Sequence, residues 1–212
     1  LAVRFAVLAI AVLAASEIAK GRPLDASLPE AFGHWDAAHY LRIAEVGYRN
    51  FGEDRFLINF FPFYPLVIWL LHFPVGSYLL AALLISFAAS VAAGFFLQKL
   101  ASLDFGAASA RYSLLFFFLF PTAFFLAVPY TEALFAALSL SSFYFARRRN
   151  WAAAGIAGLL ATATRWPGIM LFPALALEAW MQEGRRVKRA WWLLLVPLGF
   201  LSYLALNGYV TG

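Results

Sequence analysis

The sequence predicts an all-α, polytopic transmembrane helical bundle. Of its 212 residues, 64% are hydrophobic and only 13% are charged, against about 45–50% and about 25% in soluble domains. Apolar runs of helix length follow one another along the chain, and many of the basic residues gather in the short gaps between them. This sorting of charge into loops is typical of a multi-pass membrane protein.

About seven apolar runs are candidate membrane segments, because a span needs about 20 predominantly apolar residues. They cover residues 1–18, 78–98, 111–128, 131–146, 151–165, 167–180 and 190–207. Several are short for a full span, which indicates tilted or broken helices whose free backbone groups are satisfied inside the protein. The first run has Arg4 near its start but no small-residue cleavage site after Ala15. We therefore interpret it as an uncleaved helix and not as a signal peptide.

A further apolar stretch, residues 60–73, is ambiguous because it contains two prolines and covers only about 21 Å as a helix. If it spans the bilayer, the basic residues 147–149 face outward. If it re-enters or lies in the interface, the basic loops at 99–111, 147–149 and 185–189 all lie on the cytoplasmic side, which the positive-inside rule favours. The long loop at residues 17–60 is then external.

The sixteen Lys and Arg residues exceed the eleven Asp and Glu residues and give a net charge of +5. Such an excess would suit a nucleic-acid partner if the cations formed one surface. They lie in separate loops, whereas seven of the eleven acids lie between residues 17 and 60. The excess therefore indicates topology, and we expect no nucleic-acid partner. The chain has no Cys, which excludes disulfides and thiolate metal sites.

The external loop contains a polar and aromatic stretch, HWDAAHYLRIAEVGY, at residues 34–48. Residues 37–46 lack Pro and Gly, so they predict a juxtamembrane helix. Asp36 is its expected N-cap and Gly47 its expected stop.

Asp36, His39 and Tyr40 share one face of this predicted helix. A carboxylate beside a histidine and aromatic rings at the lipid boundary suits acid–base chemistry on a polar group carried by a lipid. The alternative is that Asp36 only caps the helix and that Trp35 and Tyr40 only anchor it in the interface.

A second polar group lies in PTAFFLAVPYTE, residues 121–132, where two prolines bracket an aromatic stretch. The prolines indicate a non-helical or re-entrant piece, which needs a protein-lined cavity. Glu132 lies between two apolar segments, and ionisable groups at membrane depth are functional candidates. The alternative is that Glu132 only begins the next helix, where a polar first turn suits the helix dipole.

Arg165 stands between two hydrophobic segments on the same predicted side. Its guanidinium fork suits a phosphate group, and the alternative is a snorkelling arginine at a helix end. The sequence has no Gly-rich phosphate loop, metal-spaced His cluster or Ser/His/Asp signature. Nucleotide binding is thus unsupported, and a sugar donor would arrive already attached to lipid.

Three blocks occur in order: HWDAAHY with IAEVGY (residues 34–40 and 43–48), FFPFYPL (60–66), and FPT with PYTEALF (120–122 and 129–135). Together they resemble the PIG-V-like mannosyltransferases, the family of GPI mannosyltransferase II enzymes and many prokaryotic relatives. Thr164 and Arg165, with Gly168, fall where that family has its Thr-Arg segment.

This resemblance implies the GT-C fold of glycosyltransferases, which take a sugar from a polyprenyl- or dolichyl-phosphate carrier and transfer it on the external or lumenal side. We therefore expect an inverting glycosyltransferase, specifically a mannosyltransferase, with a glycan or glycolipid acceptor and no cofactor; a divalent metal is not indicated. Residues 1–212 form one integral membrane domain, the N-terminal part of a longer enzyme, with residues 17–60 as its catalytic loop. A bacterial or archaeal plasma membrane is expected, not the ER.

The same resemblance makes Asp36 the expected catalytic carboxylate, which acts as a general base on the acceptor hydroxyl. The expected substrate-binding residues are His34, Trp35, His39, Tyr40, Arg42, Tyr130, Glu132 and Arg165. Among them, Arg165 holds the leaving phosphate together with Arg42 or His34, because its developing charge needs fixed cationic donors. Glu132 orients the acceptor or a helix terminus.

The alternative from a different functional class is a non-enzymatic transporter or flippase for lipid-linked sugars. A transporter needs polar groups near the bilayer midplane that are reached from both sides. The acids of this chain concentrate in one external loop, which favours the enzyme.

Overall fold

The computed structural model describes residue 32 and residues 35–212. Its elements, with η for a 3₁₀ helix, are α3 (Asp36–Val46), η1 (Glu53–Asn59), α4 (Phe63–Val75), α5 (Tyr78–Leu119), η2 (Pro121–Leu126), α6 (Glu132–Arg147), α7 (Trp151–Thr164), η3 (Trp166–Met170), α8 (Leu171–Glu183), η4 (Gly184–Leu194) and α9 (Leu195–Thr211). Every regular element in this part of the chain is a helix, which confirms the predicted all-α class. The predicted first segment, residues 1–18, and residues 17–31 of the predicted loop lie outside the described residues.

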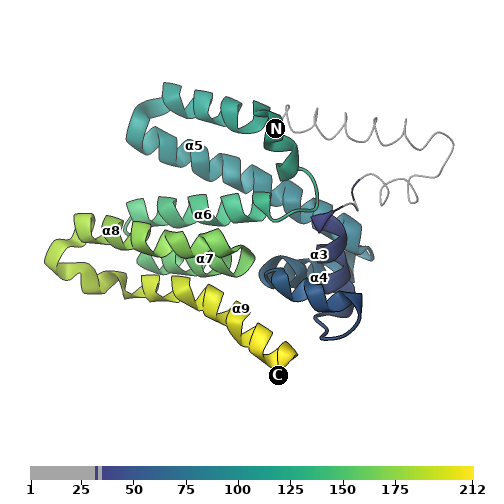
Figure 1. The fold of residues 1–212 in the computed structure, drawn as a ribbon. Helices are drawn as coiled ribbons and strands as arrows, with labels where there is room; N and C mark the ends of the chain where they lie inside the picture. The colour runs from purple at the N-terminus through teal and green to yellow at the C-terminus, as the bar shows by residue number, and fades with distance from the viewer. Residues whose placement is uncertain (1–31, 33–34) are drawn as a thin grey trace.

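Helices α5 to α9 run back and forth between two ends of the molecule (Figure 1). One end carries α3, the start of α6 and the end of α7. The other end carries the turn between α6 and α7 and the η4 segment between α8 and α9. The two predicted basic loops at 147–149 and 185–189 therefore lie at the same end, although the side of the membrane that they face stays a prediction.

Helix α5 folds back on itself as a hairpin (Figure 1). Gly106 makes the turn, because its backbone (φ 82°, ψ 174°) is not helical and only glycine adopts that region without strain. The predicted loop at 99–111 is therefore wrong except around Gly106. The predicted segment 111–128 is also wrong beyond Leu119, where the helix ends because Pro121 disfavours helical backbone in the residue before it.

The bounds of α6 and α7 agree with the predicted segments 131–146 and 151–165 to within one residue at each end. Asn150 separates the two helices, and its side chain accepts the Ala153 N–H at 3.1 Å as the N-cap of α7. The two later predicted segments are divided by 3₁₀ turns: 167–180 begins in η3, and 190–207 begins in η4.

Two described helical stretches are long and apolar enough to cross a membrane, Tyr78–Leu119 and Trp166–Thr211. Glu53–Asn59 and Phe63–Val75 would add a third candidate if they form one broken span. The chain bends by 111° between these two helices. A sharp bend at this place agrees with the irregular, proline-containing segment predicted at 60–73. Whether that segment spans or re-enters stays a prediction, as does the count of about seven.

Small residues form the contacts between α6, α7 and α9. The buried face of α7 consists of Trp151, Ala154, Gly155, Ala157, Gly158, Ala161, Thr162, Ala163 and Thr164. Small side chains let helix backbones approach closely in a membrane, where packing holds helices together without a hydrophobic driving force. A Cβ atom on Gly199 of α9 would lie 2.2 Å from the Leu159 carbonyl oxygen of α7, so only glycine fits there.

We expect Gly199→Ala to lower the thermal midpoint of the detergent-solubilised chain, because the new methyl group pushes α9 away from α7. Overpacking of this kind costs about 1–3 kcal/mol. Gly208→Ala on the same helix is the matched control, since a Cβ there meets no described atom within 4 Å. This control should keep or slightly raise the midpoint, because alanine favours helix. Equal midpoints for the two variants would contradict the close α7–α9 contact.

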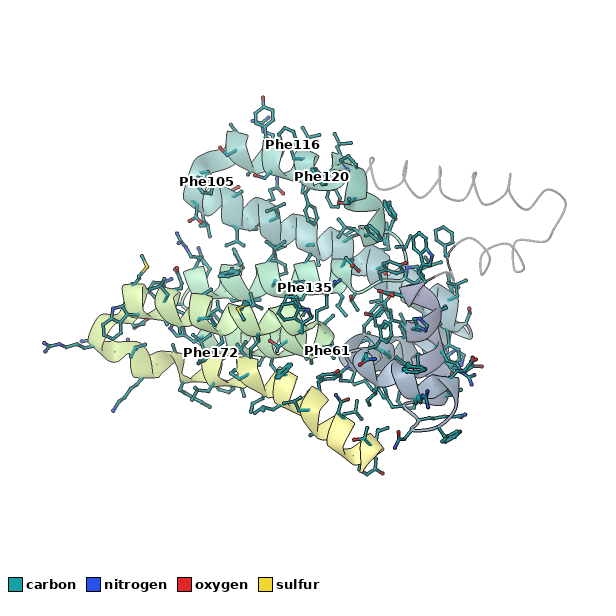
Figure 2. The ribbon with its side chains drawn as sticks, in the orientation of Figure 1. Phe61, Phe105, Phe116, Phe120, Phe135 and Phe172 are labelled. Carbon is teal, nitrogen blue, oxygen red and sulfur yellow. The ribbon has the colours of Figure 1, made fainter. Side chains whose placement is uncertain are left out.

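The second limb of α5 exposes large apolar side chains. Phe116 and Phe120, the residue directly after α5, are 71% and 63% exposed. Figure 2 shows both on the limb of α5 that follows Gly106, whereas Phe135 and Phe172 lie among the other helices. Exposed apolar surface of this extent fits contact with lipid.

Candidate functional site

Three segments that are far apart in the sequence meet at one end of the bundle: the start of α3, the start of α6, and the junction between α7 and η3 (Figure 1). They bring together Asp36, Tyr40, Tyr130, Thr131, Glu132 and Arg165. We call these six residues the polar cluster. Five of them are among the predicted site residues.

Asp36 is the first residue of α3, and it is exposed. The N-cap position belongs to Trp35, which has a positive φ of 55° and is 77% exposed. The prediction of Asp36 as N-cap is therefore wrong by one residue. No hydrogen bond or ion pair joins the Asp36 carboxylate to another described side chain. As far as the described residues go, its oxygens are therefore available to bind a substrate.

Tyr130 joins the start of α3 to the start of α6. The Asp36 backbone N–H also acts on the Tyr130 hydroxyl and lowers its pKa slightly, which places the two groups close together. Burial raises the pKa of Tyr130, and the negative charges of Asp36 and Glu132 raise it further. The Tyr130 hydroxyl thus lies close to both carboxylates.

Arg165 connects the α7–η3 junction to the start of α6. Its Nη1 atom lies 2.5 Å from Glu132 Oε1 and donates to Thr131 Oγ1 at 3.1 Å. Glu132 Oε2 is buried and has no hydrogen-bond partner among the described residues. The Arg165–Glu132 pair therefore keeps one carboxylate oxygen available to a further donor.

The chain around Arg165 is locally constrained. Helix α7 ends at Thr164, and Arg165 is extended (φ −153°, ψ 145°), with its carbonyl accepting the Gly168 N–H at 3.0 Å. A Cβ on Gly168 would lie 2.6 Å from Thr162 Cα. The close return of η3 onto α7 thus requires glycine and fixes the backbone that carries Arg165.

Tyr40 connects the polar cluster to the aromatic residues around it, because its ring lies edge-on to Phe60 and Tyr64 at centroid distances of 5.1 and 5.2 Å. Burial raises the pKa of Tyr40 to about 12, even though a hydrogen bond with Thr131 and the positive charge of Arg165 act in the opposite direction. The phenol therefore stays protonated at neutral pH and can donate a hydrogen bond.

Thr131 is the member of the cluster that the sequence did not indicate. It is 2% exposed and lies between the Tyr40 hydroxyl and the Arg165 guanidinium. In the sequence it reads only as the polar residue that precedes a helix. The feature that marks Thr131 as a site residue is a buried hydroxyl that does not cap the helix. The sequence alone does not show that this hydroxyl is buried.

A cavity of about 410 Å³ adjoins the cluster at Glu132. It is lined by Phe116, Phe117, Phe120, Thr122, Ala123, Phe125, Leu126 and Glu132. Glu132 is its one ionisable lining residue. An apolar hollow thus ends at a carboxylate that is paired with an arginine.

The remaining predicted site residues are placed differently. The Arg42 guanidinium donates to the two Asp54 carboxylate oxygens at 3.2 and 3.1 Å and lies 3.5 Å from Glu45. His39 is exposed, with its ring 5.0 Å from that of Phe60. His34 lies outside the described residues. The described residues contain no group of three or more His, Asp or Glu side chains that could hold a metal ion.

The cluster thus combines a carboxylate that no other described side chain engages, an arginine that can stabilise negative charge, and a protonated phenol. Glu132, the partner of that arginine, lines an apolar hollow. This combination suits a reaction at a polar group that is carried on an apolar chain.

A family model described as Mannosyltransferase (PIG-V) matches residues 11–176. A GPI alpha-1,6-mannosyltransferase 2 from Cricetulus griseus is 37% identical over 148 residues, which cover 64% of this chain and 29% of the relative. A protein of the same name from Homo sapiens is 38% identical over 135 residues, which cover 56% and 26%. The match thus spans less than a third of the length of these relatives. No solved structure matches the chain significantly.

Proposed function

The chain belongs to the mannosyltransferase (PIG-V) family of membrane proteins, and from this premise we propose that the protein transfers mannose from a polyprenyl- or dolichyl-phosphate carrier to an acceptor hydroxyl. The transfer takes place on the external side of the membrane and inverts the anomeric configuration. The acceptor is a glycan or a glycolipid. The protein has about seven membrane segments in all, and they are arranged as in the GT-C glycosyltransferases.

The observation that carries this proposal is the meeting of Asp36, whose carboxylate bonds no other described side chain, with the Arg165–Glu132 pair at one end of an apolar bundle. A sugar transfer from a lipid phosphate needs a base for the acceptor and a cation for the leaving group. Both kinds of group lie here within one cluster.

In the proposed reaction, Asp36 takes the proton of the acceptor hydroxyl while the oxygen attacks the anomeric carbon of the sugar. The new C–O bond forms as the bond from the anomeric carbon to the phosphate oxygen breaks. The electron pair of that bond leaves with the lipid phosphate, whose charge Arg165 stabilises. One displacement of this kind inverts the anomeric centre.

Glu132 and Tyr40 prepare the site for this step. Glu132 Oε1 holds the Arg165 guanidinium, and its buried Oε2 is an acceptor for a hydroxyl of the bound sugar or acceptor. The protonated Tyr40 phenol positions the Thr131 hydroxyl through the hydrogen bond between them. The hollow beside Glu132 suits the chain of the lipid carrier, because its aromatic lining offers apolar contact next to the reacting phosphate.

The test measures sugar transfer by the full-length natural protein in proteoliposomes that contain polyprenyl-phosphate mannose with a radioactive sugar. We expect a glycosidic product that requires both donor and acceptor. Movement of the labelled donor across the bilayer without a product would instead identify a flippase and overturn the proposal.

We expect Thr131→Val to lower kcat/KM about fivefold to tenfold, because the buried hydroxyl between Tyr40 and Arg165 is lost while the shape of the side chain is kept. Thr131→Ser restores the hydroxyl and should recover most of the activity. Steady-state transfer kinetics of the two variants check this positioning role. Equal losses in both variants would indicate that Thr131 acts only through packing.

The bacterial or archaeal plasma membrane expected from the sequence stays a prediction. Both relatives described above come from eukaryotes and give it no support. The helices and the family together identify an integral membrane protein.

A further inference from the structure

The end of the bundle opposite the polar cluster carries cations that have no partner within the described part of the chain. Six Lys and Arg side chains at this end make no hydrogen bond or ion pair with any described residue, and we call them the basic end. They are Arg148, Arg149, Arg185, Arg186, Lys188 and Arg189. All six are exposed.

The nearby carboxylates are already engaged. Arg147 pairs with Asp104 and lies 3.6 Å from Glu178, which also accepts a hydrogen bond from Gln182. Glu183 Oε1 accepts the Trp151 Nε1–H at 3.4 Å. With Arg147, seven Lys and Arg side chains at this end stand against three carboxylates, Asp104, Glu178 and Glu183, so positive charge is in excess there.

The η4 segment has the composition of a membrane-interface element. Ala190 and Leu193 are buried against the bundle, whereas Trp191 is 55% exposed and stacks on Trp192 at a centroid distance of 4.3 Å. Trp180, in the last turn of the neighbouring α8, is 62% exposed. Tryptophan beside Lys and Arg at the end of apolar helices is typical of the level of the lipid headgroups.

Arg149 occupies a backbone conformation that favours glycine. Its φ is 57°, where an L-residue with a large side chain is strained. The turn is held by the backbone, since the Arg149 N–H bonds the Ala146 carbonyl at 2.9 Å. The arginine side chain is thus not needed to make the turn.

We propose that the basic end binds the phosphate headgroups of anionic phospholipids in the adjacent membrane leaflet. Unpaired Arg side chains offer bidentate donors to phosphate, and an anionic leaflet attracts each cation near its surface. The site lies at the opposite end from Asp36, so it is separate from the proposed transfer reaction and does not rest on it.

The experiment titrates the full chain in detergent micelles with phosphatidylglycerol or phosphatidylcholine and counts the bound lipids by native mass spectrometry. We expect phosphatidylglycerol to bind preferentially and its binding to weaken as ionic strength rises. The double variant Arg185→Gln/Arg189→Gln should lower its affinity about tenfold or more. Inorganic phosphate alone should not displace it at equal concentration, because it lacks the acyl chains.

The matched control, Arg49→Gln/Arg55→Gln, removes the same charge from the loop after α3 and from η1, at the other end of the bundle. It should bind phosphatidylglycerol as the unmodified chain does. Arg149→Gly should weaken binding while it keeps or raises the thermal midpoint, because glycine relieves the strained turn. Equal binding of the two lipids, equal losses in the two double variants, or a preference for an acidic peptide such as polyglutamate over the anionic lipid would overturn the proposal.

Discussion

Asp36→Asn is expected to reduce mannose transfer about 10²–10⁴-fold, the usual range for loss of a general base. Asn has nearly the same shape as Asp but cannot take the proton of the acceptor hydroxyl. Since the Asp36 carboxylate bonds no described side chain, the substitution breaks no described contact, and the fall should appear in kcat. The measurement is the initial rate of transfer from labelled polyprenyl-phosphate mannose in proteoliposomes.

Glu45→Gln is the matched control for Asp36→Asn. Glu45 is an exposed carboxylate on the same helix, and its described partner is Arg42 at 3.5 Å. The control should transfer mannose at nearly the unmodified rate and should insert into the membrane equally well. Wild-type activity in Asp36→Asn would rule out this residue as the base.

Arg165→Gln is expected to reduce kcat about 10²–10³-fold, as seen when a preorganised donor to a developing charge is removed. Arg165→Lys should recover only a small part, because an ammonium group keeps the charge but not the fork that reaches both Glu132 and the phosphate. Separate values of kcat and KM distinguish the loss of transition-state stabilisation from the loss of ground-state binding. If Arg165 holds the phosphate only in the transition state, the variant has a lower kcat. If Arg165 holds it equally well in the ground state, the variant has a higher KM.

Two controls accompany Arg165→Gln. Arg55→Gln removes an exposed guanidinium that lies over the Phe56 ring at 4.6 Å, and it should leave transfer nearly unchanged. The thermal midpoint of Arg165→Gln shows whether the loss of the Glu132 partner unfolds the start of α6. Unchanged transfer in a folded Arg165→Gln variant would contradict the proposed role in holding the phosphate.

Local signals predicted the parts of the fold that depend on neighbouring residues. The predicted ends of α6 and α7 follow from apolar runs that stop at Arg147–Arg149 and at Arg165, and in the structure Asn150 caps the start of α7. Residues 99–105 were predicted as a loop from their charges, yet their backbone has helix-forming residues and no proline, so the helix continues to Gly106.

The candidate site depended on contacts that no local pattern contains. Asp36, Glu132 and Arg165 were predicted from their chemistry, but their meeting depends on the packing of the whole bundle: α3 packs on α4 and α5 and so lies at the same end as the start of α6 and the end of α7. Thr131 was missed because only that packing buries its hydroxyl. Arg42 was predicted near the phosphate from its type, but Asp54, twelve residues later, engages its guanidinium.

The length of α7 determines how far below the lipid headgroups the proposed transfer reaction takes place. Its 14 residues rise only about 21 Å, about 9 Å less than the hydrocarbon thickness of a typical bilayer. If the Arg147–Arg149 turn lies at one headgroup level, Arg165 at the other end of α7 lies below the opposite one. On the proposed function, the lipid-borne phosphate then reaches the polar cluster from within the bilayer, whereas the acceptor reaches it from the water.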